Sequence, residues 1–137
     1  MYERARSSAM LKIFLVEDSP LVRRRIAALI GAIKGVEIVG EAEDASDALS
    51  GIAAGEADVV IVDLRLTGGS GLDVLAGLAQ SSRPVITIVL TNYSSAVIRE
   101  ACLAAGANYF FDKTSEFNLA RDVIERIARA RPATATD

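Results

Sequence analysis

The chain has 137 residues, of which 51% are hydrophobic and 24% are charged, proportions typical of one globular domain. It contains no histidine, which excludes Ser-His-Asp catalysis, histidine metal sites and a phosphohistidine made on this chain. A single cysteine excludes an intramolecular disulfide, and a net charge of −3 gives no bulk signature for nucleic acid. Because neither a signal-peptide layout nor a membrane-length apolar run is present, we expect a cytoplasmic protein.

Five apolar segments rich in valine and isoleucine follow one another at nearly even spacing. They are residues 11–16, 36–39, 59–62, 85–90 and 109–111. Most are continuous rather than alternating, which is typical of strands that are covered on both faces of a parallel sheet. Each step has room for one helix and two short loops. The pattern predicts an α/β fold of the (βα)5 type, with a doubly wound, five-stranded parallel sheet.

Capping residues mark where the intervening helices are expected to begin. The predicted N-caps are Asp18-Ser19 before Pro20, then Asp44, Ser70, Ser94 or Ser95, and Ser115. In the last helix, the residues expected on the buried side are Leu119, Val123, Ile124 and Ile127. We expect residues 1–9 to form a flexible N-terminal extension, residues 10–129 one domain, and residues 130–137 a flexible tail.

Charged and hydroxyl side chains follow the ends of four predicted strands. Glu17 and Asp18 follow the first strand, Asp63 the third, Thr91 the fourth and Lys113 the fifth. Open parallel sheets bind ligands at the carboxyl ends of their strands, so these side chains are expected to lie together. Clustered carboxylates repel one another unless a cation lies among them, and oxygen ligands suit Mg²⁺. With a lysine and a hydroxyl donor opposite, the set describes a site for a phosphoryl group on an aspartate.

Four segments around these residues resemble the receiver domain of bacterial two-component response regulators. They are residues 15–18, 59–64, 89–91 and 106–113, and the resemblance extends over residues 11–128. It implies the flavodoxin-like strand order 2-1-3-4-5, Mg²⁺ as cofactor, and a histidine kinase or histidine phosphotransfer protein as phosphodonor. It also implies a signalling domain that catalyses only its own phosphorylation and dephosphorylation. We expect the single-domain type, a monomer or weak homodimer acting on an unknown downstream protein or in a phosphorelay, without direct contact to nucleic acid or membrane.

The resemblance also implies a role for each residue at this edge of the sheet. Asp63 is the expected phosphoacceptor, and Lys113 is expected to contact a phosphoryl oxygen. Thr91 is the expected switch hydroxyl, and Phe110 occupies the position of the aromatic switch residue. The expected ligands of Mg²⁺ are Glu17, Asp18, Asp63 and the backbone carbonyl of Arg65. Because phenylalanine lacks the hydroxyl of the tyrosine often found at position 110, packing alone is expected to set its orientation.

One departure from the common receiver pattern and one pair of bulky residues bear on the site. Thr114 follows Lys113 where many receivers have a proline after a cis bond, and the sequence leaves the isomer open. Arg65 and Tyr93 lie two residues past the expected phosphoacceptor and switch hydroxyl, at positions that control how water reaches a phosphoaspartate. This bulky pair predicts slow loss of phosphate.

Residues 23–25 are three consecutive arginines, interpreted first as a solvated helix face and alternatively as a docking surface for the phosphodonor. Two rival functions are also open. A haloacid-dehalogenase-type phosphatase needs a second aspartate two residues after its nucleophile, where this chain has Arg65. A degenerate receiver would only bind partners, and the intact pair of Asp63 and Lys113 argues against it. Neither GxGxxG nor GxxxxGK occurs, which disfavours a nucleotide-binding domain.

Overall fold

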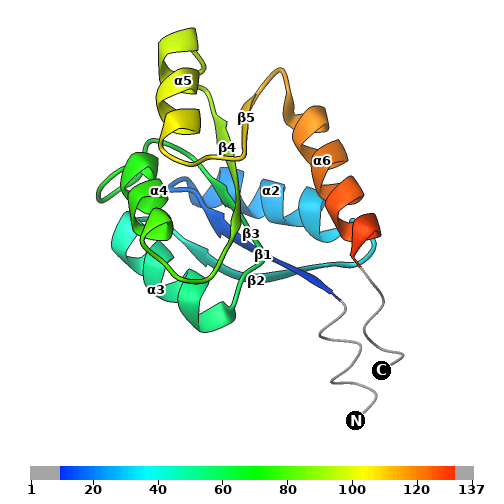
Figure 1. The fold of residues 1–137 in the computed structure, drawn as a ribbon. Coiled ribbons are helices and arrows are strands. Elements are labelled where there is room, and N and C mark those ends of the chain that lie inside the picture. The colour runs from blue at the N-terminus through cyan, green and yellow to red at the C-terminus, as the bar shows by residue number, and fades with distance from the viewer. Residues whose placement is uncertain (1–9, 132–137) are drawn as a thin grey trace.

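The computed structural model describes residues 10–131 as a central sheet with helices packed against it (Figure 1). The strands are β1 (Leu11–Val16), β2 (Val36–Ala42), β3 (Val59–Val62), β4 (Ile86–Thr91) and β5 (Tyr109–Asp112). The helices are α2 (Pro20–Gly31), α3 (Ala45–Gly55), α4 (Gly71–Ala79), α5 (Ala96–Ala104) and α6 (Phe117–Ala130). Within residues 10–131, none of the helices has the length and apolar character needed to cross a membrane.

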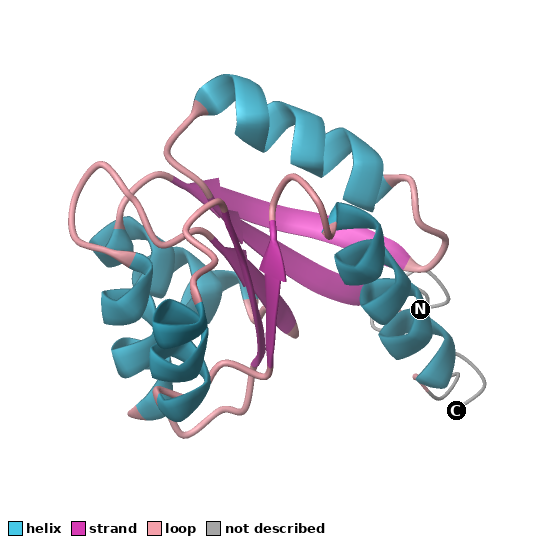
Figure 2. Ribbon diagram, turned by 90° about the horizontal axis from the view of Figure 1, so that it is seen from above, coloured by secondary structure: helices cyan, strands magenta, loops and turns pink. Residues whose placement is uncertain are grey.

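The strand order is β2-β1-β3-β4-β5 and every pairing is parallel, which confirms the predicted fold class. Helices α2 and α6 cover one face of the sheet and α3, α4 and α5 cover the other, so helices lie on both sides of the strands in Figure 2. Val16 at the end of β1 is paired with Val62 at the end of β3. The residues that follow these two strands therefore leave the sheet side by side.

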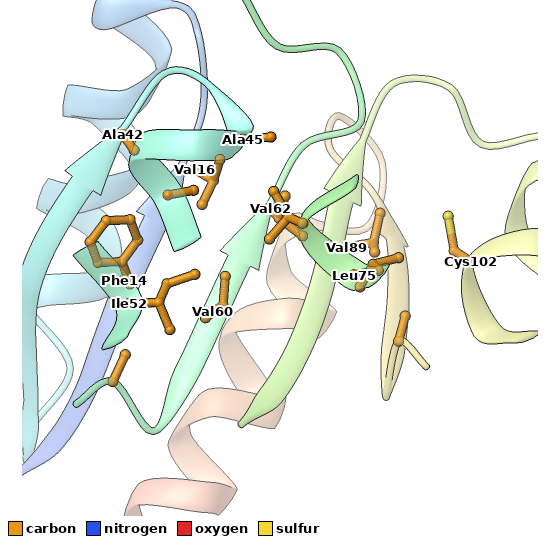
Figure 3. Close-up of a cluster of buried hydrophobic side chains, with 14 of the residues drawn as sticks. Phe14, Val16, Ala42, Ala45, Ile52, Val60, Val62, Leu75, Val89 and Cys102 are labelled. Carbon is orange, nitrogen blue, oxygen red and sulfur yellow. The ribbon is translucent and has the colours of Figure 1, made fainter. Parts of the chain in front are cut away.

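Successive residues of each strand point to opposite faces and enter two separate hydrophobic clusters. On the α3–α5 side, Phe14, Val60 and Val62 pack with Leu75 and Cys102 (Figure 3). The α2–α6 side contains Ile13, Leu15, Val59, Ile61 and Ile124. Burial of a side chain of this size contributes about 1.5–3 kcal/mol relative to exposure, so the two covered faces hold the strand ends firmly in register.

Three of the predicted helix caps are confirmed by their hydrogen bonds. The side-chain oxygens of Ser19, Asp44 and Ser95 accept hydrogen bonds from backbone N–H groups three residues further on, over 3.3, 2.8 and 3.2 Å. The prediction that the last helix begins at Ser115 is wrong, because α6 begins at Phe117. The carboxylate of Asp112 accepts hydrogen bonds from the N–H groups of residues 114 and 115, which holds both residues in a turn.

Leu119 is 49% exposed, so its predicted burial is also wrong. It lies beside Tyr109 and Phe111 in an open groove between α6 and β5, which is an edge strand of the sheet formed by residues 10–131. The predicted extension at residues 1–9 and residues 132–137 of the predicted tail lie outside the described residues. The predicted boundary at residue 129 falls inside α6, whose last residue is Ala130.

Candidate functional site

Three carboxylates meet at the carboxyl end of the sheet. Ligand oxygens of Glu17, Asp18 and Asp63, hereafter the carboxylate cluster, all lie within 4.8 Å of one another. Glu17 and Asp63 are only 4% and 6% exposed. The ammonium of Lys113 lies between them, donating hydrogen bonds to Glu17 Oε1 at 2.7 Å and to Asp63 Oδ2 at 2.5 Å. The structure thus brings together residues that are 96 and 50 positions apart in the sequence.

Backbone hydrogen bonds carry the parallel ladder one residue past each strand and so place these side chains. The N–H of Asp63 donates to the carbonyl of Val16 at 3.0 Å, and the N–H of Glu17 donates to the carbonyl of Ala42 at the same distance. The N–H of Lys113 donates to the carbonyl of Thr91 at 2.8 Å. The site is therefore an extension of the sheet itself, built on rigid strands.

The cluster carries more negative than positive charge. Burial raises the pKa of Glu17 above its ordinary value, despite the opposing effect of Lys113. Burial also disfavours the charged form of Lys113, but hydrogen bonds to Asp63 and Glu17 outweigh it and raise the pKa of the ammonium. When ionised, three carboxylates and one ammonium leave two excess negative charges, which a divalent cation would balance. Oxygen-only donors with this charge fit Mg²⁺.

The two expected switch residues occupy the neighbouring strands. Thr91 is fully buried at the end of β4, and its hydroxyl oxygen accepts a hydrogen bond from the N–H of Tyr93 at 3.2 Å. Phe110, on β5, is 3% exposed and packs on the α3–α5 side of the sheet. The Lys113–Thr114 bond, whose isomer the sequence left open, is trans, since no peptide bond in the described part of the chain is cis.

Arg65 and Tyr93 contact each other across the loops that follow β3 and β4. The guanidinium of Arg65 donates a hydrogen bond to the Tyr93 hydroxyl, and its central carbon lies 5.2 Å from the centroid of the ring. The two bulky side chains noted in the sequence therefore form one contact pair on the exposed side of the site.

Arg99 of α5 gives Phe110 a polar partner that sequence analysis did not predict. Its guanidinium carbon lies 5.8 Å from the centroid of the Phe110 ring, and Nη1 donates to the Phe110 carbonyl at 3.2 Å. A cation–π contact whose cation is exposed, as Arg99 is, contributes about 0.5–1 kcal/mol. The orientation of Phe110 is therefore set by packing together with these direct contacts to Arg99 of α5.

Gly71 and Asp112 are two further site residues that the sequence analysis passed over. A Cβ on Gly71 would lie 2.4 Å from the carbonyl oxygen of Asp63, so no larger residue fits without displacing the expected phosphoacceptor. Asp112 accepts hydrogen bonds from the Ser94 hydroxyl and from the N–H groups of the turn after Lys113, which lower its pKa to about 2. An aspartate at the start of a turn is a signal readable in the sequence, whereas the close approach of Gly71 is not.

An α/β domain with this strand order, and with carboxylates and a lysine at the carboxyl end of its sheet, falls in the class of phosphoacceptor signalling domains. The family model described as the response regulator receiver domain matches residues 13–125, and the chain belongs to this family. It is therefore a receiver domain of two-component signal transduction. Receiver domains generally bind Mg²⁺ through an acidic pocket, and the donors of the carboxylate cluster fit that ion.

Individual relatives agree with this assignment. The chain is 33% identical over 115 residues to the DNA-binding transcriptional activator DevR/DosR of Mycobacterium tuberculosis, covering 83% of this chain and 53% of that protein. It is 33% identical over 104 residues to the response regulator UvrY of Escherichia coli, covering 76% and 48%. The chain thus spans about half the length of the curated relatives it matches.

Solved structures show the same architecture. A two-component response regulator of the LuxR family from Aurantimonas sp. SI85-9A1 aligns with a TM-score of 0.81 and 28% identity, over 89% of this chain and 87% of that one. The BeF3-activated N-terminal receiver domain of RstA from Klebsiella pneumoniae aligns with a TM-score of 0.71 and 30% identity, over 83% and 97%.

Proposed function

We propose that Asp63 accepts a phosphoryl group from a phosphohistidine on a partner protein, in a reaction that depends on Mg²⁺. The partner is a histidine kinase or a histidine phosphotransfer protein. The observation that carries this proposal is the burial of Asp63 among two further carboxylates and in contact with Lys113. Concentrating negative charge in a buried site stabilises the folded chain poorly unless a cation balances it, and a bound cation can also offset the charge of a phosphoryl group during transfer.

Each residue of the site has a task in this proposal. A carboxylate oxygen of Asp63 attacks phosphorus while the bond from phosphorus to the imidazole nitrogen breaks. The carboxylate cluster and the Arg65 carbonyl would hold Mg²⁺, which would supply positive charge beside the phosphoryl oxygens during transfer. Lys113 stays protonated, because its pKa is raised, and pairs with a phosphoryl oxygen. The hydroxyl of Thr91 donates a hydrogen bond to another.

The output of the switch is proposed to be the face formed by α5, β5 and α6. Cys102 is the one buried residue among the nine of helix α5, so few side chains anchor the helix to the sheet. Arg99 connects the helix directly to Phe110. Movement of Thr91 towards the phosphoryl group changes the space around Phe110, and the contacts between Phe110 and Arg99 transmit that change to α5. This population shift either controls a downstream protein or accompanies transfer of the phosphoryl group along a phosphorelay.

The proposal is tested by incubating the protein with Mg²⁺ and either acetyl phosphate or beryllofluoride, followed by mass spectrometry or NMR spectroscopy. We expect a stable adduct in the wild type and none in Asp63→Asn. A degenerate receiver would form no adduct, and an aspartyl phosphatase would turn acetyl phosphate over continuously. Either result contradicts the proposal.

Slow loss of phosphate is a second part of the proposed function, and it rests on the contact between Arg65 and Tyr93. The two exposed side chains contact each other, and we propose that the pair restricts the approach of water to the phosphoaspartate. We expect Arg65→Ala and Tyr93→Ala each to shorten the lifetime of the phosphoaspartate. A wild-type lifetime of seconds or less without any phosphatase, or variants with unchanged lifetimes, would contradict this expectation.

A further inference from the structure

Arg23 behaves differently from its two arginine neighbours, so the interpretation of residues 23–25 as a solvated face is wrong for Arg23 and holds for the other two. Arg24 and Arg25 are exposed, whereas the side chain of Arg23 is only 15% exposed and turns back to the sheet. Its Nε donates to Glu41 at 2.9 Å, and its Nη2 pairs with Glu43 at 3.1 Å. The docking of a phosphodonor on this face stays a prediction, for which Arg24 and Arg25 are the exposed side chains.

The third contact of Arg23 reaches the proposed cation site. Its Nη1 donates to the backbone carbonyl of Glu17 at 2.7 Å. That carbonyl belongs to the peptide unit joining Glu17 to Asp18, whose plane sets the direction in which both side chains leave the backbone. The N–H of Glu17 is held by the carbonyl of Ala42, so Arg23 supplies the restraint on the other side. A small cavity under the cluster is lined by Arg23 together with Glu17 and Asp63.

The charges around Arg23 suit a supporting position. Because its hydrogen bond goes to a carbonyl, the guanidinium leaves the carboxylate oxygens of the cluster available to a cation, unlike Lys113. Glu41 and Glu43, at the end of β2, balance the positive charge of Arg23 and hold its planar guanidinium in one orientation. Because the two glutamate side chains are 41% and 47% exposed, solvent screens these ion pairs and they contribute little to stability.

We propose that Arg23 is a positioning residue for the Mg²⁺ site, because it fixes the peptide unit between two of the expected metal ligands. This inference rests on the proposed function for the identity of the cation. The alternative is that Arg23 only fastens α2 to the loop after β2. The two differ in what they predict for cation affinity, since a fastener affects folding but leaves the cluster unchanged in the folded protein.

The test is a titration of the protein with Mg²⁺ alone, followed through the backbone amide signals of Asp18 and Lys113 in NMR spectra. We expect Arg23→Ala to raise the Mg²⁺ concentration at half-saturation about tenfold, the usual effect of losing a residue that orients metal ligands. Arg24→Ala is the matched control and should bind as the wild type does. The double variant Glu41→Gln/Glu43→Gln, which keeps the bond to the Glu17 carbonyl, should show a much smaller shift.

Wild-type Mg²⁺ affinity in folded Arg23→Ala overturns the inference, even where the melting temperature falls. If Arg23→Ala does not fold, Arg23→Lys is used instead, because the single ammonium of lysine cannot reach all three partners of the guanidinium. An intermediate increase in the Mg²⁺ concentration at half-saturation supports the inference, and an unchanged Mg²⁺ affinity overturns it. No phosphodonor is present in the titration. A wild type that binds Mg²⁺ but forms no adduct on Asp63 would thus refute the proposed function and leave the inference on Arg23 standing.

Discussion

The two ends of the sheet each hold an aspartate among basic side chains, yet the two groups are built differently. At the carboxyl end, Asp63 and Lys113 pair at 2.5 Å with side chains 7% and 15% exposed. At the amino end, Asp58 pairs with Arg83 at 3.4 Å and Arg131 at 3.2 Å, with side chains between 24% and 41% exposed. One group is buried with excess negative charge, whereas the other is partly accessible to solvent.

This difference separates a group that fits a structural role from one that fits the proposed site. The Asp58 group connects the start of β3, the loop before β4 and the end of α6. Because solvent screens its charges, holding them together costs the folded protein little free energy. Removing carboxylates from water is costly, and a single lysine does not balance three of them. Burial together with charge imbalance therefore marks the carboxyl end as the site, which neither property would do alone.

Loss of Lys113 should have the largest effect, because it leaves the carboxylate cluster without its cation. We expect Lys113→Met to lower the free energy of unfolding by about 3 kcal/mol in the presence of EDTA, as for other buried pairs broken on one side. Mg²⁺ should restore much of that stability, and no stable adduct should form. Urea denaturation with EDTA and with Mg²⁺ measures both effects. Wild-type stability in EDTA would show that the cluster is not strained by its charge.

Replacing a glycine should be more harmful at the carboxyl end of the sheet than at the amino end. Gly71→Ala places a Cβ against the Asp63 carbonyl, and we expect a loss of about 2–3 kcal/mol together with impaired adduct formation. Gly106 precedes β5 at the amino end, where a Cβ meets open space, but its φ of +112° disfavours other residues. Gly106→Ala should therefore lose only about 1 kcal/mol and form the adduct normally. Equal effects in denaturation and adduct assays would contradict the comparison.

Removing the charge of Asp58 should be a mild change. We expect Asp58→Asn to lower the free energy of unfolding by about 0.5–1 kcal/mol, because its ion pairs are partly exposed and the amide oxygen can still accept from the Lys12 N–H. Adduct formation on Asp63 should stay at the wild-type level. A strong loss of phosphorylation in this variant would mean that the amino end contributes to function.

The smallest expected effect is the pH dependence due to Asp112. Because the pKa of its carboxyl falls from 3.8 to about 2 in the folded protein, its ionised form stabilises the fold above the unfolded value. That stabilisation is lost as the pH falls from about 4 towards 2. The difference in melting temperature between wild type and Asp112→Asn should be constant near neutral pH and shrink below pH 4, measured by circular dichroism. A difference that grows on acidification would contradict the assigned hydrogen bonds.

Sequence by itself determined the (βα)5 order and the composition of the carboxylate cluster. Both follow from local patterns, since continuous apolar runs indicate buried parallel strands and the carboxyl ends of such strands share one edge. Tertiary structure alone decided that Arg23 turns inward while Arg24 stays exposed, that Leu119 is left open beside the edge strand, and that Gly71 must lack a side chain. The physical reason is that these outcomes depend on distances between elements remote in sequence, which no periodicity or spacing along the chain records.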